Sequence, residues 1–240
     1  MNHLQIIQRY LDEKRSLLEI PDSGYPFVTI SRQTGAGAHL LTQALLAELK
    51  PRERTDLYRG WHVFDRELFE IVAQDPTLRG ALEPLAAERY PSEFKQFMDS
   101  LFTGRSDPYL SYKRTFHVVR MLAAIGKVIL VGRAGCCVTR DLRAGVHVRL
   151  VAPEHRRIFW LMQRYQLTRE EARRIVAKLD VDRAKLIKLF FNRNIDDPLL
   201  YDVVWNTDQA DVRTIAASVM QLIEDRATRK RKSEALAGAV

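Results

Sequence analysis

The sequence predicts an α/β fold, with a mostly parallel sheet that is covered by helices on both faces. Two observations predict it. Apolar runs at 27–30, 127–131 and 146–151 are rich in β-branched residues, too short for helices and typical of buried parallel strands. Segments with apolar residues at helical spacing separate these runs, and strands that alternate with helices favour a parallel sheet. Ligands of such sheets bind at the carboxyl ends of the strands, so the residues that follow each run are candidates for a site.

The first strand is preceded by a predicted helix and followed by a glycine turn. Apolar residues at helical spacing predict an amphipathic helix over residues 3–20, which residues 21–24 end. The strand at 27–30 leads into Gly35 and Gly37. A second helical pattern then predicts a helix that ends near Lys50 and Pro51.

The middle of the chain carries one short strand, several helices and two strong strands. Residues 61–64 form a short apolar piece that ends in Asp65, and residues 67–72 have a helical pattern. Residues 76–125 lack any strong strand signal, and their prolines separate several predicted helices, the last over 109–125. Gly132 and Arg133 close the strand at 127–131, and the strand at 146–151 follows.

The last third of the chain is predicted to be mainly helical. Pro153 starts a helix, where its missing N–H costs nothing. Thr168 and Glu171 have the spacing of a capping box, so a new helix is predicted from about residue 169 to Asp180, with a second helix from about Asp182. Residues 196–198 break the pattern, residues 201–206 form a last strand, and residues 211–229 form a closing amphipathic helix.

Composition narrows the class of protein. The chain has 240 residues, of which 46% are hydrophobic and 28% charged, as in soluble globular proteins that bury a substantial core. No apolar run approaches the roughly 18–20 residues that span a membrane, and the N-terminus lacks a signal-peptide core. Cys136 and Cys137 are adjacent and are not expected to form a disulfide, which favours a reducing, cytoplasmic setting. The six histidines show no metal-ligand spacing, so no protein-bound metal is expected.

The net charge of +8 has two main sources, a central cluster of arginines at 169–193 and a basic run near the C-terminus. Such a run is usually a solvated helix end or tail, and less often a nucleic-acid anchor. The arginines of the central cluster could serve a nucleotide substrate or a polynucleotide. The basic run contains Arg226, Arg229, Lys230, Arg231 and Lys232.

The turn between the first strand and its helix is a candidate phosphate cradle. A strand, a glycine turn and a helix point several backbone N–H groups at one spot, with the positive end of the helix dipole behind them. Against the phosphate-loop pattern G-x-x-x-x-G-K-[ST], Gly37 fills the second glycine, whereas Arg32, Ala38 and His39 stand at the first glycine, the lysine and the hydroxyl residue. The alternative is an ordinary tight turn in which glycine only relieves crowding.

Several short motifs occur along the chain in a definite order. They are Ile30-Ser31-Arg32, Gly35-Ala36-Gly37, Phe64-Asp65-Arg66-Glu67-Leu68, Val131-Gly132-Arg133, Ala152-Pro153 with Arg157, Asp180 with Arg183, Asp197-Pro198, Tyr201-Asp202 and Asn206-Thr207.

Together these motifs resemble the cytidylate kinase-like family, a branch of the nucleoside monophosphate kinases of the P-loop fold. The resemblance covers roughly residues 25–225 and implies a single kinase-like domain over 1–240. That domain would have an N-terminal helix at about 1–24, an acceptor-binding insertion at about 65–125, a helical lid at about 154–198 and a basic tail at about 226–240.

The resemblance has one chemical gap. Cytidylate kinases carry a lysine and a hydroxyl residue in the loop, where this chain has Ala38 and Leu40. The cytidylate kinase-like group often lacks that lysine as well, so the gap leaves membership open and puts the activity in question. Arg32 lies on the same loop, and we expect its guanidinium to supply the lost charge.

The resemblance also implies roles for the other residues, and each has a structural alternative. Arg133 would grip the acceptor's phosphate, or pair with a core carboxylate. The lid residues Arg157 and Arg183 would close on the nucleotides, or be solvated, and Asp65 would bind the acceptor or cap a helix. Asp180 would bind the acceptor, or form a surface ion pair with Arg183. The predicted site has catalytic Arg32, Arg133, Arg157 and Arg183, phosphate-binding Gly35, Ala36, Gly37, Ala38 and His39, and acceptor-binding Asp65, Arg133 and Asp180.

Three classes of function remain open. The first is ATP-dependent phosphoryl transfer, with Mg²⁺ as the family implies, to a nucleoside monophosphate such as CMP or dCMP or to a related small acceptor. The second is a nucleotide-binding module that has lost turnover, for which Ala38 and Leu40 are the argument. The third, a nucleic-acid binder, is the least favoured, because the sequence shows no helix-turn-helix, RNA-recognition or zinc pattern.

Overall fold

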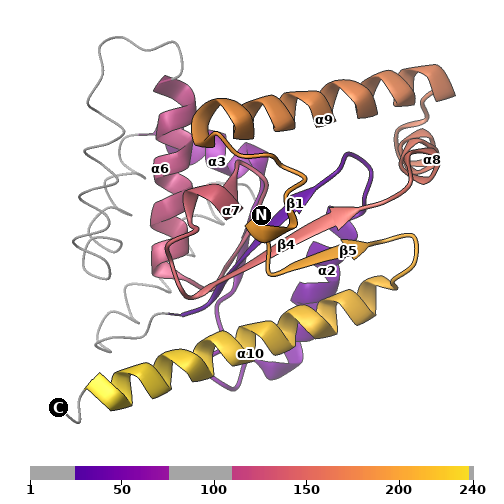
Figure 1. The fold of residues 1–240 in the computed structure, drawn as a ribbon. Coiled ribbons are helices and arrows are strands. Elements are labelled where there is room, and N and C mark those ends of the chain that lie inside the picture. The colour runs from indigo at the N-terminus through magenta and orange to yellow at the C-terminus, as the bar shows by residue number, and fades with distance from the viewer. Residues whose placement is uncertain (1–24, 76–109, 238–240) are drawn as a thin grey trace.

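The computed structural model describes residues 25–75 and 110–237 (Figure 1). The helix predicted over 3–20 and much of the predicted insertion, residues 76–109, lie outside the described residues. None of the helices in the described ranges is both long and apolar enough to cross a membrane.

Five parallel strands form one sheet in the order β2-β3-β1-β4-β5. The strands are β1 (Phe27–Arg32), β2 (His62–Phe64), β3 (Val128–Val131), β4 (Gly145–Val151) and β5 (Val203–Asn206). β1 is the central strand, and its Ile30 lies beside Val131 of β3 and Val148 of β4. The prediction of a parallel α/β sheet is confirmed, and every strand predicted from an apolar run is present.

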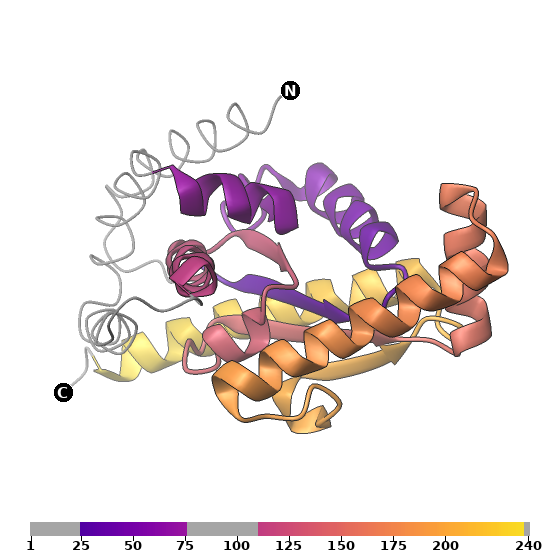
Figure 2. The same ribbon diagram turned by 90° about the horizontal axis from the view of Figure 1, so that it is seen from above.

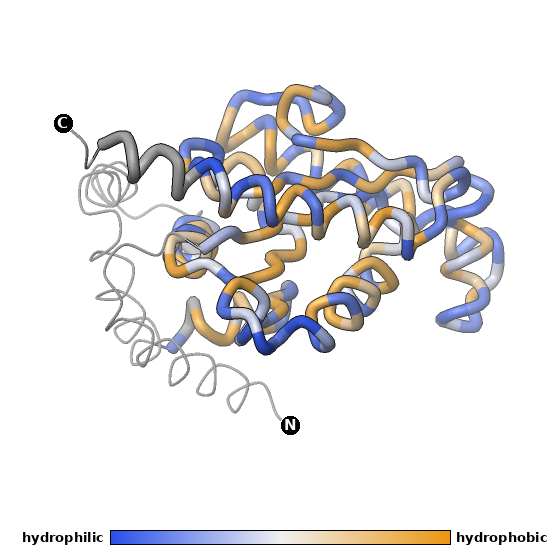
Figure 3. The backbone as a smooth tube through the Cα atoms, turned by 90° about the horizontal axis from the view of Figure 1, so that it is seen from below, coloured by the Kyte–Doolittle hydropathy of each residue, from blue (hydrophilic) through white to orange (hydrophobic). Residues whose placement is uncertain are grey.

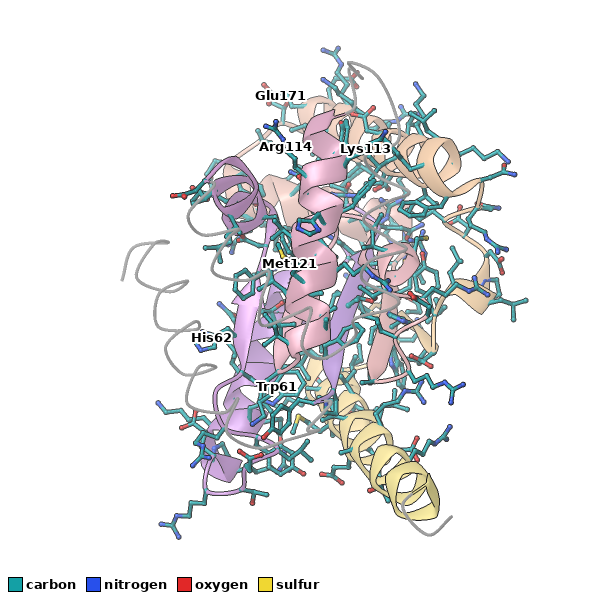
Figure 4. All side chains as sticks on the ribbon, turned by 90° about the vertical axis from the view of Figure 1, so that its left-hand side faces the viewer. Trp61, His62, Lys113, Arg114, Met121 and Glu171 are labelled. Carbon is teal, nitrogen blue, oxygen red and sulfur yellow. The ribbon has the colours of Figure 1, made fainter. Side chains whose placement is uncertain are left out.

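Helices cover both faces of the sheet, because the side chains of β1 alternate between two cores (Figure 2). Val28 and Ile30 pack with α2 (Ala38–Leu49) and α10 (Val212–Ala237). Phe27 packs with α3 (Arg66–Gln74), α6 (Leu110–Ile125) and α7 (Gly135–Val138). Figure 4 looks onto α6, with Lys113 and Arg114 toward one end and the buried Met121 along its length. Figure 3 shows hydrophobic residues concentrated along the central strands.

Two helices form an arm beyond the sheet. α8 (Glu154–Tyr165) follows β4, and α9 (Arg169–Phe191) runs back across the molecule toward α6 (Figures 1 and 2). They share a small core of their own, made of Ile158, Leu161, Ala172 and Val176 with partly buried neighbours.

The predicted break between two helices near Asp180 is wrong. α9 is one helix of 23 residues that begins with the predicted capping box of Thr168 and Glu171. No glycine or proline interrupts residues 169–191, and the side chain of Asp180 bonds to other elements instead of capping a new helix. Short polar side chains favour helix ends on average, but Asp180 lies inside a helix because its side chain has hydrogen-bond partners on other elements.

The C-terminal basic run is helical. α10 extends to Ala237, beyond the end predicted at residue 229. Arg226 lies where α10 passes the start of β4: its Nε donates to the carbonyl of Gly145, and its guanidinium pairs with Asp202. This part of the predicted tail is therefore joined to the sheet.

A partly buried histidine makes the stability of the fold depend on pH. Nδ1 of His147, on β4, lies 2.8 Å from the hydroxyl oxygen of Thr29 on β1. Burial lowers the pKa of His147 to about 4, with Asp202 opposing the shift and Arg226 and Arg140 adding to it. The ring is therefore neutral in the folded protein near neutral pH.

We expect the protein to lose stability as the pH falls from about 6.5 toward 4. The unfolded chain takes up a proton at His147 near its ordinary pKa of 6.5, whereas the folded chain does not until about 4, so acid favours unfolding. Between pH 6.5 and 5 the loss amounts to at most about 2 kcal/mol. Urea unfolding at pH 7.5 and 5 would measure it, and His147→Gln should flatten the dependence. An equally steep dependence in the variant would assign it to other groups.

Candidate active site

The loop between β1 and α2 has the backbone of an anion cradle. Gly35 and Gly37 both have positive φ, 82° and 80°, which other residues rarely adopt. A Cβ on Gly35 would lie 2.7 Å from the backbone oxygen of Arg157, so glycine is needed for α8 to approach the loop. Gly37 caps α2 without a side-chain hydrogen bond, so the first N–H groups of α2 have no intrahelical partner and are available to an anion.

Asp180 joins the glycine loop to the arm formed by α8 and α9. One carboxylate oxygen, Oδ1, accepts from the backbone N–H and the hydroxyl of Thr34, both at 2.7 Å, and from Arg183 at 3.0 Å. The other, Oδ2, accepts from Arg157 at 2.7 Å. The carboxylate of Asp180 thus joins the glycine loop, α8 and α9 in one hydrogen-bonded network. It does not form only the solvated surface ion pair with Arg183 that their i,i+3 spacing suggests.

Arg157 is held by the protein on three sides. Its side chain is 9% exposed, Nε donates to the carbonyl of Ala152, and Nη1 donates to Asp180 and to the carbonyl of Thr34. Arg157, which was predicted as a lid arginine, is therefore buried, and its hydrogen bonds join α8 to the glycine loop.

Three arginines converge where the central strands end. Arg32 is the last residue of β1, Arg133 follows β3, and Arg183 lies on α9. The guanidinium of Arg32 lies against Gly132, where an added Cβ would come within 2.0 Å of its Nη1. Burial, followed by the positive charges of Arg183 and Arg133, lowers the pKa of Arg32 to about 10. The negative charges of Asp65 and Asp180 oppose this shift but are weaker. Burial also lowers the pKa of Arg183, against the attraction of Asp180.

Two adjoining cavities open at this point. The larger has a volume of about 1070 Å³ and includes the glycine loop and Asp65, and the smaller, of about 290 Å³, includes Gly132 and Arg133. Both are lined by Arg32, Val131, Leu179 and Arg183, so these residues form their common wall. The larger cavity is also lined by Ala38 and His39, which stand at the lysine and hydroxyl positions of the loop pattern.

Asp65 is a helix cap at the edge of the larger cavity. Its Oδ1 accepts from the N–H groups of Glu67 and Leu68, at 3.1 and 3.2 Å, which confirms the capping alternative. Its second oxygen has no hydrogen bond to the described residues, so Asp65 can cap α3 and bind a ligand at the same time.

An aromatic wall was not predicted from the sequence. Trp160 and Tyr165, on α8, line the larger cavity, and the ring of His39 lies 4.8 Å from that of Trp160. Arg164 lies over Trp160 at 5.4 Å, and burial followed by the charge of Arg164 lowers the pKa of His39. Aromatic residues at these spacings on an amphipathic helix are typical of core packing, so the pattern carried no separate signal.

A family model decides the membership of the chain. The model described as the cytidylate kinase-like family matches residues 27–209, from β1 to the end of the sheet. The chain belongs to the cytidylate kinase-like family. Its parallel sheet with helices on both faces is the α/β fold that the sequence predicted.

One solved structure shares the fold of this cytidylate kinase-like protein, and two others are more distantly similar. An uncharacterized protein from Eubacterium ventriosum is 20% identical with a TM-score of 0.61, and the match covers 83% of this chain and 98% of that one. A shikimate kinase from Bacteroides thetaiotaomicron is 12% identical with a TM-score of 0.42, over 83% and 98% of the two chains. The protein TT1252 from Thermus thermophilus is 16% identical, also with a TM-score of 0.42, over 82% and 97%. No curated protein matches the sequence.

Proposed function

We propose that this cytidylate kinase-like protein transfers the terminal phosphoryl group of ATP to a nucleoside monophosphate such as CMP or dCMP. The observation that supports it best is the common wall of the two cavities, where Arg32 and Arg183 lie between the glycine loop and Arg133. In this proposal the loop binds the donor's phosphates through backbone N–H groups, and Arg133 binds the phosphate of the acceptor.

Phosphoryl transfer requires little covalent participation by protein side chains. An oxygen of the acceptor's phosphate forms a bond to the terminal phosphorus of ATP as the bond to the ADP oxygen breaks, and charge builds up on the oxygens in between. Arg32 and Arg183 lie where these oxygens would be and would stabilise that charge. The α8–α9 lid, fixed by Asp180, would exclude water and so favour transfer over hydrolysis.

Release of ADP from ATP tests the proposal directly. We expect release to depend on the acceptor in a panel of CMP, dCMP, UMP, AMP and GMP, with the highest kcat/KM for a cytidine nucleotide. Arg174→Gln, which removes an exposed arginine of α9, should behave like the parent. ADP release at the same rate with and without every acceptor would contradict transfer to a nucleoside monophosphate.

A second candidate, a nucleotide-binding module without turnover, is favoured by one observation. Ala38 stands where P-loop enzymes carry the lysine that reaches the donor's outer phosphates, and its methyl group offers no charge. ATP that raises the melting temperature, together with no ADP release for any acceptor, would support this candidate. Steeply salt-dependent binding of RNA or DNA without any effect of nucleotides would instead support the nucleic-acid function.

A further inference from the structure

The glycine loop and the carboxylate bonded to it do not supply the ligands of a magnesium ion held by the protein, although the family implies Mg²⁺ with ATP. In P-loop enzymes a loop hydroxyl and an aspartate hold this ion. Here His39 stands at the hydroxyl position of the loop pattern and Leu40 at that of the cytidylate kinases, and neither has a hydroxyl group; the ring of His39 packs on Trp160. Within the described ranges, no three His, Cys, Asp or Glu side chains come together in a way that could hold a metal.

The polar groups closest to the loop are occupied by the protein. Asp180 accepts four hydrogen bonds from Thr34, Arg157 and Arg183. The hydroxyl of Thr34 donates to Asp180 and accepts from Arg183, and the hydroxyl of Thr42 donates to the carbonyl of Ala38. The acids that line the cavities are Asp65, Glu67 and Asp182, and one oxygen of Asp65 caps α3. Mg²⁺ prefers one or two carboxylates beside the phosphates, and Asp180, the carboxylate that is hydrogen-bonded to the glycine loop, has both of its oxygens occupied by protein donors.

Arg32, in contrast, is a cation without a partner in the described part of the protein. Its guanidinium makes no hydrogen bond there and has no carboxylate within ion-pair distance, although it is partly buried and lines both cavities. Arg133 and Arg183 place two more positive charges nearby. A desolvated cation beside like charges is costly, and an anion in the cleft would remove that cost.

We propose that the cleft binds polyphosphate without a divalent cation, with Arg32 supplying the charge that a metal supplies elsewhere, together with Arg133 and Arg183. The inference rests on the proposed function in one respect, that the cleft receives the phosphates of a nucleotide. A guanidinium offers several donors in one plane and stays protonated, so it can contact oxygens of two neighbouring phosphates. Its place on the wall between the cavities suits contacts on both sides.

Calorimetric binding of inorganic tripolyphosphate tests the inference. This probe has no base and no acceptor, so the result does not depend on turnover. In EDTA we expect the parent to bind it, and added Mg²⁺ to leave the Kd within about threefold or weaken binding by competing for the probe. Arg32→Gln should weaken metal-free binding by about 10- to 100-fold, and Arg32→Lys should be intermediate. The control Arg174→Gln should bind like the parent.

Thermal unfolding separates this role from a structural one. Because the folded protein disfavours the charge of Arg32, Arg32→Gln should melt at the same temperature as the parent or higher. In EDTA, tripolyphosphate should raise the melting temperature of the parent and not that of the variant. If Arg32→Gln does not fold, the effect of Mg²⁺ on tripolyphosphate binding by the parent still tests the inference.

Two results would overturn the inference: binding by the parent that requires Mg²⁺, or an Arg32→Gln variant that binds metal-free tripolyphosphate as tightly as the parent. If the protein releases ADP but binds tripolyphosphate only with Mg²⁺, the inference fails and the proposed function stands. Metal-free binding without ADP release would leave the inference standing and remove the proposed function.

Discussion

Asp180→Ala is expected to lower the free energy of unfolding by about 3 kcal/mol, because it removes one partner of a partly buried ion-pair network. The change leaves Arg157, 9% exposed, without its carboxylate, and removes the acceptor for the N–H and hydroxyl of Thr34. The value is taken at the lower end of the range for buried pairs, since the Asp180 side chain itself is 26% exposed. Urea unfolding of parent and variant measures the difference.

The same substitution should impair nucleotide binding, because Asp180 holds the lid on the glycine loop. We expect the KM for ATP to rise about tenfold or more once α8 and α9 are no longer fixed against Thr34. Asp182→Ala is a matched control on the same helix, exposed and without hydrogen bonds among the described residues, and should change stability by no more than about 0.5 kcal/mol. An Asp180→Ala protein as stable as this control would mean that the network contributes little.

The fold was predictable because its strongest signals are local. The central strands are short buried runs between glycines, and the capping box of Thr168 and Glu171 marks the start of α9. Ligands of parallel sheets bind at the carboxyl ends of the strands, and this principle places the glycine loop, Asp65 and Arg133 at one edge of the sheet. The two cavities at that edge, lined by these residues, confirm the placement.

The roles of charged residues were less predictable, because they depend on partners far away in the sequence. Asp180 lies 146 residues from Thr34 and 23 from Arg157, and helical spacing indicates only its neighbour Arg183. The helix break that was predicted between Asp180 and Asp182 does not exist, because α9 is continuous there. The burial of Arg157 and the position of Arg32 against Gly132 follow from how α8 and β3 approach the loop, which no periodicity encodes.

Arg133→Ala is expected to lower kcat/KM for the acceptor by roughly 100- to 1000-fold, since a bidentate guanidinium contact with phosphate combines two charge-assisted hydrogen bonds. The loss should lie mainly in the KM of the acceptor, with the KM of ATP little changed, because Arg133 lines the smaller cavity and the glycine loop the larger. Arg133→Lys should have a kcat/KM for the acceptor only about tenfold higher than that of Arg133→Ala, because an ammonium group cannot make the planar two-point contact. Steady-state kinetics with each substrate varied in turn measure these effects.

Stability decides between this role and a core ion pair at Arg133. The residue has a φ of 51°, and arginine and alanine bear a similar cost in that conformation, so Arg133→Ala should leave the free energy of unfolding within about 1 kcal/mol of the parent. Arg140→Ala, an exposed arginine just after α7, is the control for the loss of one positive charge. If Arg133→Ala unfolds much more easily than Arg140→Ala while the KM of the acceptor is unchanged, Arg133 holds the core together and another cation must bind the acceptor's phosphate.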